Sequence, residues 1–292
     1  GKGADAGQNR VYRSLVPVAV FDVQYQASHP VAMAFDAKVA EFASRPERCP
    51  PGVVEAYRMH RGLFSKSTRA LSNELAARGV GHLYNDPTGR INEQMLCHGT
   101  EWMAVKSIIQ TGFKGAPSAS SAGMAGSHAG TAYGAGNYFA EAVEKIDQYS
   151  RNGWWLDDAE LEGLLPDPFY QSMKRAYQLQ ETVDPCRERL LRPMLFSRVS
   201  LGCFAPVDKC TLRDHNATLL KDPATGRGLP VYADTNRDRL AAPWDSVILM
   251  EGEQSAPRCK SRFKEVITFD NAQSLPALLV VYTRTPIRYK QP

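Results

Sequence analysis

Three short segments of the sequence contain residue types that could act on a bound ligand. These are LCHGT at 96–100, YGAGNYFA at 133–140 and KEVITFDNAQ at 264–273. The ring of His98 can donate or accept a hydrogen bond, the ring of Tyr138 can stack on a flat molecule, and Glu265 brings a negative charge. Gly99 leaves the backbone beside the histidine open to a ligand. Together these groups could hold a flat polar molecule and place a carboxylate beside it.

Two other classes of site are not supported by the sequence. The GlyAlaGly run at 134–136 lacks the third glycine and the strand-turn-helix context of a dinucleotide-binding fold. The six cysteines include no CxxC pair, so we expect no metal and free thiols.

The composition of the 292 residues is typical of a soluble globular protein. Apolar residues make up 43% and charged residues 23%, and mean hydropathy is −0.36. No apolar run approaches the roughly 20 residues that cross a bilayer, so we expect no membrane partner. The formal charge of +4 comes from scattered residues and does not require a nucleic-acid partner.

The elements that must position these residues change in character along the chain. Apolar spacing predicts a strand at 16–25, helices at 31–43, 53–79 and 101–110, and a strand at 91–100. Helical composition recurs at 140–150 and in a block at 154–191, and short strands follow from 193 to the C-terminus. The predicted fold class is α+β with a largely antiparallel sheet, because regular βαβ alternation is absent.

The three segments occur in the order found in the poly(ADP-ribose) polymerase catalytic domain, and the chain resembles that family. The supporting runs are NE at 92–93, GF at 112–113, SLG at 200–202 and DSV at 245–247, with Tyr149 and Pro276. The resemblance implies a diphtheria-toxin-like fold of the His-Tyr-Glu class, with a split, largely antiparallel β-sheet core and flanking helices. We expect a flexible linker at 1–15 and one catalytic domain at 16–292, with a helical insertion at about 154–191.

The resemblance implies that NAD⁺ is the co-substrate and assigns roles to individual residues. Glu265, His98 and Tyr138 would be catalytic. The Glu265 carboxylate would bind the 2′-hydroxyl of the nicotinamide ribose and favour the cation that develops when nicotinamide leaves. Tyr138 and Tyr149 would sandwich the nicotinamide ring, His98 would bind a ribose hydroxyl, and the Gly99 backbone would pair with the carboxamide. The implied NAD⁺ contacts are His98, Gly99, Thr100, Tyr133, Gly136, Tyr138, Phe139, Ala140 and Tyr149.

One position departs from the family pattern. Ile146 stands where relatives usually carry a serine that binds the carboxamide, so Lys145 or Ser150 substitutes for it, the local alignment shifts, or nicotinamide is held less tightly. The loop rich in Gly, Ala and Ser at 115–136 coincides with the family's donor loop, which lies over NAD⁺. The acceptor loop is expected within 221–245.

The resemblance predicts an enzyme that transfers ADP-ribose from NAD⁺ to a macromolecular acceptor. A protein side chain is the first choice of acceptor and a nucleic acid the second. An NAD⁺ glycohydrolase toxin and a silent module that binds NAD⁺ or ADP-ribose are the alternatives. Whether one ADP-ribose or a polymer is added stays open. We expect a location in the cytoplasm or nucleus, with delivery as a secreted effector as the alternative.

Overall fold

A computed structural model describes ten segments of the chain, together with residues 74 and 77. The segments are 12–46, 90–114, 136–150, 153–157, 159–183, 189–207, 219–221, 228–230, 244–249 and 263–286. The predicted helix at 53–79, the glycine-rich loop up to residue 135, and most of the expected acceptor loop lie outside these segments.

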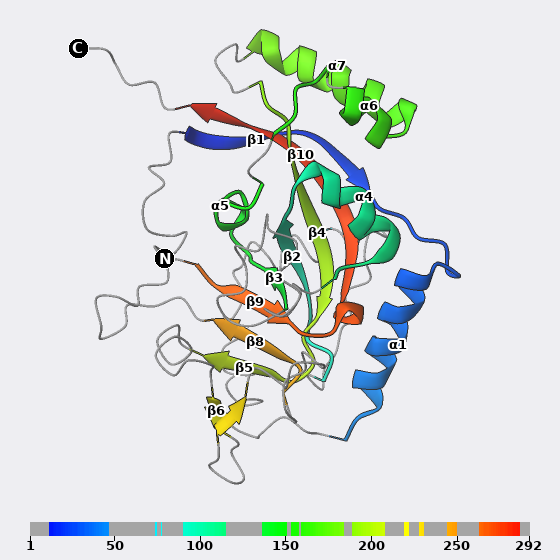
Figure 1. The fold of residues 1–292 in the computed structure, drawn as a ribbon, viewed down its shortest axis with the longest axis vertical. Helices are drawn as coiled ribbons and strands as arrows, with labels where there is room; N and C mark the ends of the chain where they lie inside the picture. The colour runs from blue at the N-terminus through cyan, green and yellow to red at the C-terminus, as the bar shows by residue number, and fades with distance from the viewer. Residues whose placement is uncertain are drawn as a thin grey trace, which may run out of the picture.

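A four-stranded antiparallel sheet, called sheet A here, has the strand order β1-β10-β4-β2. Its strands are β1 (Tyr12–Asp22), β10 (Ser274–Pro286), β4 (Arg192–Ser200) and β2 (Glu93–Gly99). β10 therefore lies between β1 and β4, although β1 is near the start of the chain and β10 near its end (Figure 1). Because side chains alternate along a strand, Leu279 and Val281 face one side of sheet A while Leu278 and Tyr282 face the other.

A second sheet, sheet B, has the order β3-β9-β8-β5 and is antiparallel except between β5 and β8. Its strands are β3 (Asn137–Phe139), β9 (Glu265–Thr268), β8 (Ser246–Leu249) and β5 (Phe204–Val207). Cys97 and Ala140 exchange two backbone hydrogen bonds of 2.9 and 3.0 Å, which join β2 to the end of β3. The two sheets are thus halves of one split sheet. A small hairpin of β6 (Leu219–Lys221) and β7 (Gly228–Pro230) adds to the described strands.

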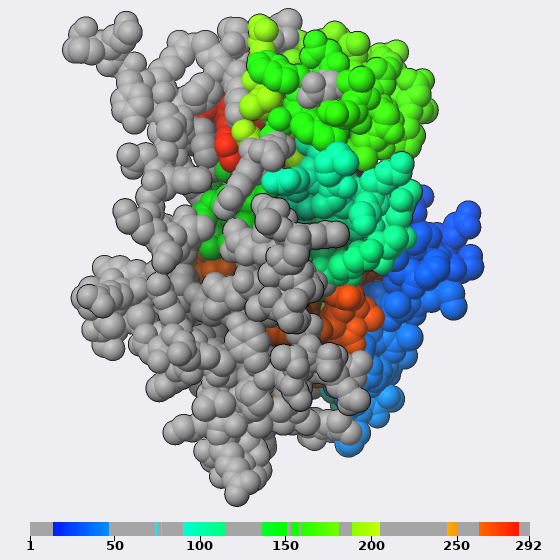
Figure 2. Space-filling view, viewed as in Figure 1, coloured from blue at the N-terminus to red at the C-terminus, as the bar shows by residue number. Residues whose placement is uncertain are grey.

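Three helices cover one face of sheet A: α4 (Trp102–Thr111), α6 (Ala159–Leu164) and α7 (Asp167–Val183). Tyr170, Met173 and Tyr177 recur at helical spacing on α7 and are buried against the sheet. The range that contains α6 and α7 is closed at its base, where Trp154 and Leu191 exchange backbone hydrogen bonds of 2.9 and 2.8 Å. The surfaces of α7, α4 and α1 lie next to one another along one side of the molecule (Figure 2).

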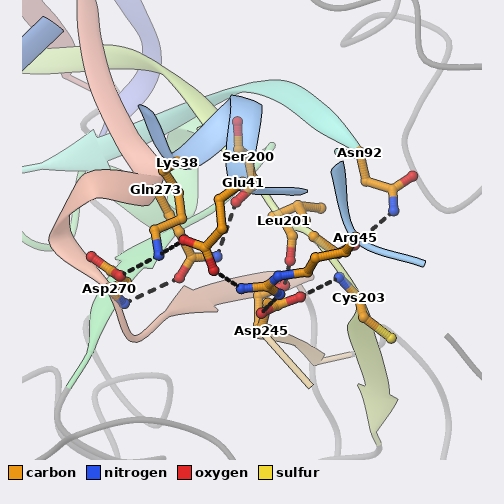
Figure 3. Close-up of polar contacts among 12 residues, drawn as sticks. Lys38, Glu41, Arg45, Asn92, Ser200, Leu201, Cys203, Asp245, Asp270 and Gln273 are labelled. Carbon is orange, nitrogen blue, oxygen red and sulfur yellow. Dashed lines mark hydrogen bonds and ion pairs between the residues drawn. The ribbon is translucent and has the colours of Figure 1, made fainter. Parts of the chain in front are cut away.

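Helix α1 (Pro30–Ser44) packs an apolar stripe that includes Phe35 and Phe42 on Ile91 and Leu275. Ion pairs also hold the polar side of α1 in place (Figure 3). Lys38 Nζ lies 2.8 Å from a carboxylate oxygen of Asp270, the residue that caps the 3₁₀ helix η2 (Asn271–Gln273).

Farther along the helix, Arg45 donates to Asp245 over 2.6 Å, next to β8. Asp245 in turn accepts from the backbone N–H of Cys203 over 2.8 Å. Helix α1 is therefore tied both to the turn that follows β9 and to the start of β8.

The helices and the two largely antiparallel sheets confirm the predicted α+β class. Some details differ from the sequence-based prediction. The first strand begins at Tyr12 rather than Val16, and the helical composition at 140–150 forms only the four-residue helix α5 (Val143–Ile146). Cys97 is a buried free thiol, but Cys203 takes part in a disulfide, so the prediction of free thiols is wrong there.

Candidate active site

The three motif segments meet where the split sheet joins. β2 carries His98 and Gly99, β3 carries Tyr138, and β9 begins at Glu265. Tyr138 stands opposite Ile267 in the β3–β9 ladder, and the Cys97–Ala140 bridge brings β2 beside the end of β3. Residues that are far apart in the sequence therefore lie close together at the junction of the two sheets.

The ring of His98 is held in one orientation by a hydrogen bond and by two phenylalanines. Its Nδ1 lies 2.8 Å from the backbone carbonyl oxygen of Tyr138. Phe113 meets the ring edge-on with centroids 5.0 Å apart, and Phe139 lies at 5.5 Å. Because a carbonyl oxygen only accepts hydrogen bonds, Nδ1 carries the proton of the neutral ring and Nε2 is left as an acceptor.

Burial favours this neutral form. Desolvation lowers the pKa of His98, while the hydrogen bond to the Tyr138 carbonyl acts in the opposite direction and is the smaller effect. The Nε2 atom of the neutral ring can accept a hydrogen bond from a hydroxyl group of a ligand.

Gly99 is required by the close approach of another segment. A Cβ atom at this position would lie 2.3 Å from the backbone oxygen of Ile146 and 2.9 Å from Cβ of Tyr149. The glycine thus lets the turn after α5 pack directly on β2, and it brings Tyr149 against the residue that follows His98 in the chain.

Glu265 is buried beside a buried lysine. Lys145 Nζ lies 3.3 Å from Oε1 of Glu265, and the two side chains are 4% and 7% exposed. The same ammonium group lies 5.6 Å from the centre of the Tyr149 ring. A buried carboxylate of this kind needs a paired cation, and Lys145 supplies it from α5.

A second ion pair involves Lys264, the residue before Glu265 in the chain. Lys264 Nζ is 3.5 Å from Oε2 of Glu141, and both side chains are mostly buried. Two lysine–glutamate ion pairs therefore join the start of β9 to the segment that follows β3. The described residues contain no group of three or more His, Cys, Asp or Glu side chains that could hold a metal ion.

The comparison with family models agrees with this geometry. Residues 65–283, more than half of the chain, match the model described as the poly(ADP-ribose) polymerase catalytic domain. The chain belongs to this family. A search of curated proteins found no match. Among the described residues, no helix is long and apolar enough to span a membrane.

The three residues considered at the expected position of the carboxamide-binding serine are buried and engaged in other contacts. Ile146 is buried in an apolar cluster with Cys97, Met194 and Tyr282. The hydroxyl of Ser150 donates to the carbonyl oxygen of Pro193 over 2.8 Å and is fully buried. Lys145, the other candidate substitute, is engaged with Glu265.

The remaining candidate residues of the poly(ADP-ribose) polymerase pattern line the same region in part. Thr100 and Ala140 are buried. Gly136 packs so tightly that a Cβ atom would lie 2.7 Å from the Thr268 oxygen. Tyr133 lies outside the described residues.

Two residues of this region had no site role in the sequence-based prediction. Phe113 packs on His98, and Lys145, considered only as a substitute for the serine, pairs with Glu265. The Gly-Phe run at 112–113, two residues before the glycine-rich loop, was the local sign for Phe113, and nothing local indicated that Lys145 pairs with Glu265.

Proposed function

We propose that the protein cleaves the bond between nicotinamide and ribose in NAD⁺ and transfers ADP-ribose to a protein side chain. The observation that carries the proposal is the Glu265 carboxylate, buried beside Lys145 on the strand that pairs with the Tyr138 strand. Family membership supports ADP-ribosyl transfer in general. The acceptor, and the role of each residue, are the parts that we propose.

The chemistry explains why a fixed carboxylate is needed. As the bond breaks, its electron pair passes to the pyridinium nitrogen, nicotinamide leaves as a neutral molecule, and positive charge develops on the ribose. A preorganised negative charge beside the ribose lowers the energy of that state without reorganising at the moment of reaction. The acceptor then attacks the ribose C1′ carbon and loses its proton. Glu265 is the carboxylate that we assign to this role.

His98 and Gly99 are assigned to binding NAD⁺. The Nε2 atom of the neutral His98 ring is suited to accept a hydrogen bond from a ribose hydroxyl. The backbone at Gly99 has no side chain and is suited to pair with the carboxamide. Tyr138 and Tyr149 are assigned to the two faces of the nicotinamide ring, where offset stacking binds without charge.

Three other activities remain as alternatives to protein modification. The mild positive charge of +4 favours a nucleic-acid acceptor. If water takes the place of the acceptor, the protein is an NAD⁺ glycohydrolase. A silent NAD⁺-binding module would not need the buried Lys145–Glu265 pair. Burying two charges carries a desolvation penalty, which favours a catalytic role for the pair.

One experiment separates these activities. The protein is incubated with NAD⁺ labelled in the adenylate part, with and without RNA and a mixed protein acceptor, and the label is followed as free ADP-ribose, on protein and on RNA. Label on protein that disappears in Glu265→Gln is the expected result. Free ADP-ribose alone would indicate a glycohydrolase, label on RNA a nucleic-acid acceptor, and intact NAD⁺ with measurable binding a silent module.

A further inference from the structure

The segment that carries Lys145 cannot hold its own conformation. Helix α5 has four residues, far fewer than the roughly 12 that an isolated helix needs in water. Yet the segment places Lys145 against Glu265 and packs Tyr149 against Gly99. Contacts outside the segment must therefore fix it.

The strongest of these contacts converge on Asp147, which follows α5 directly and is 2% exposed. Its Oδ1 atom accepts from the Tyr282 hydroxyl over 2.8 Å and from Nε of Arg284 over 3.0 Å. Nη2 of Arg284 lies 2.9 Å from the same carboxylate oxygen and also donates to the Asp147 backbone carbonyl over 3.2 Å. Charge-assisted bonds in a buried place are stronger and more directional than bonds between neutral groups.

The donors come from β10, in the middle of sheet A. Burial and the negative charge of Asp147 raise the pKa of Tyr282, so its hydroxyl stays protonated and donates. Tyr282 is the register partner of Arg192 on β4. Arg192 donates over 2.7 Å to the backbone carbonyl of Ser150, at the end of the same segment.

The segment is thus fastened to two neighbouring strands, and Asp147 is the only one of its carboxylates, among the described contacts, that reaches β10. Lys145 lies two residues before Asp147, and Tyr149 lies two residues after it. A shift of this anchor would move both side chains relative to Glu265 and Gly99.

We propose that Asp147 is a positioning residue: held by Tyr282 and Arg284, it fixes the segment that places Lys145 beside Glu265 and Tyr149 against Gly99. Its effect on turnover rests on the proposed function, because that effect requires Glu265 to act in NAD⁺ cleavage. Asp147 itself touches neither Glu265 nor Gly99 in the described contacts.

Two variants of the full chain loosen the anchor to different degrees. Asp147→Asn keeps the size but removes the charge that binds Arg284, and Tyr282→Phe removes one hydrogen bond. Glu93→Gln is the matched control, since Glu93 is a buried carboxylate paired with Arg198 at 2.5 Å, away from α5. Nicotinamide release should show kcat lowered about tenfold in Asp147→Asn and less in Tyr282→Phe, because a small misplacement of a catalytic group is costly. Glu93→Gln should lower the unfolding temperature but keep kcat.

A coupling test separates positioning from general stability. Asp147→Asn is combined with Lys145→Met, which removes the side chain that the anchor is proposed to place. If Asp147 acts in part by placing Lys145, its substitution should lower kcat by a smaller factor in the Lys145→Met protein than in the wild type, and the remaining loss should come from Tyr149. Multiplicative losses in the double variant would overturn the proposal.

Hydrogen exchange gives a readout that does not depend on NAD⁺ turnover. In both anchor variants, amides of residues 143–150 should exchange faster while those of β10 and β4 keep their protection. Unchanged exchange in this segment, with a folded protein, would overturn the anchoring role. If the wild-type protein releases no nicotinamide, the proposed function fails, and the exchange result still decides whether Asp147 fixes the segment.

Discussion

The ammonium group of Lys145 and the carboxylate of Glu265 form an ion pair of 3.3 Å in a place where both side chains are more than nine-tenths buried. The two residues come from a four-residue helix and from the first position of β9. Removing one member of such a pair leaves a buried charge, which costs far more than the pair itself contributes. Substituting Lys145, Glu265 or both therefore allows the effect of the pair on stability to be measured apart from the effect of Glu265 on catalysis.

We expect Lys145→Met to destabilise the protein by about 3 kcal/mol, because Glu265 then lies buried without this cation. Glu265→Gln leaves Lys145 buried without this carboxylate and should also destabilise the protein. The double variant Lys145→Met/Glu265→Gln should be more stable than the sum of the single changes indicates, since neither charge remains. Urea unfolding of the four proteins measures this coupling, and strictly additive losses would mean that the two side chains do not interact.

Glu265→Gln should retain the fold and NAD⁺ binding but lose most of the transfer activity. Loss of one preorganised electrostatic contact costs on the order of 3 kcal/mol in the barrier, or about a hundredfold in rate. Activity is measured well below the unfolding temperature, with NAD⁺ binding followed by calorimetry. Glu93→Gln serves as the control for substitution of a buried carboxylate elsewhere. Wild-type turnover in the Glu265 variant would remove Glu265 from the proposed mechanism.

Much of the fold could be predicted from local patterns. The apolar spacing of Phe35 and Phe42 gave helix α1, and the run rich in Leu and Val within β10 gave a strand. These features depend on neighbours within one or two turns, which the sequence displays directly. Glu265, His98 and Tyr138 were brought together by family resemblance rather than by any spacing between them.

The supporting contacts could not be predicted, and the reason is physical. Lys145 pairs with Glu265, and Asp147 with Arg284, across distances in sequence that leave no periodic signal. Composition alone predicted a helix over 140–150, which is longer than α5. Helix propensity carries no information on how closely the turn after Ile146 packs on Gly99. Tertiary packing decided that boundary.

The stability of the protein should depend on the protonation of His98. Because burial lowers the pKa of His98 below its ordinary value of 6.5, the unfolded chain binds this proton more readily than the folded protein. The contribution is therefore fully present above that value and is lost as pH falls through the lower pKa of the folded state. The difference in unfolding free energy between the wild type and His98→Gln should shrink over this acidic window. A difference that is constant with pH would contradict the buried neutral ring.

The last prediction concerns Gly99. Adding a single methyl group there should abolish NAD⁺ binding while the rest of the chain still folds. In Gly99→Ala the new Cβ would meet the Ile146 backbone oxygen at 2.3 Å, and backbone atoms cannot move aside as a flexible side chain can. The turn that carries Tyr149 must shift, so we expect loss of NAD⁺ binding and at least a tenfold loss of turnover.

Gly163→Ala is the matched control, since nothing lies within 4 Å of a Cβ there and the residue is exposed on α6. That change should stabilise the protein by about 0.5–1 kcal/mol, because alanine favours a helix over glycine. Calorimetric titration with NAD⁺ and thermal unfolding of both variants provide the test. Wild-type affinity in Gly99→Ala would mean that the packing of the α5 turn on β2 does not shape the NAD⁺ site.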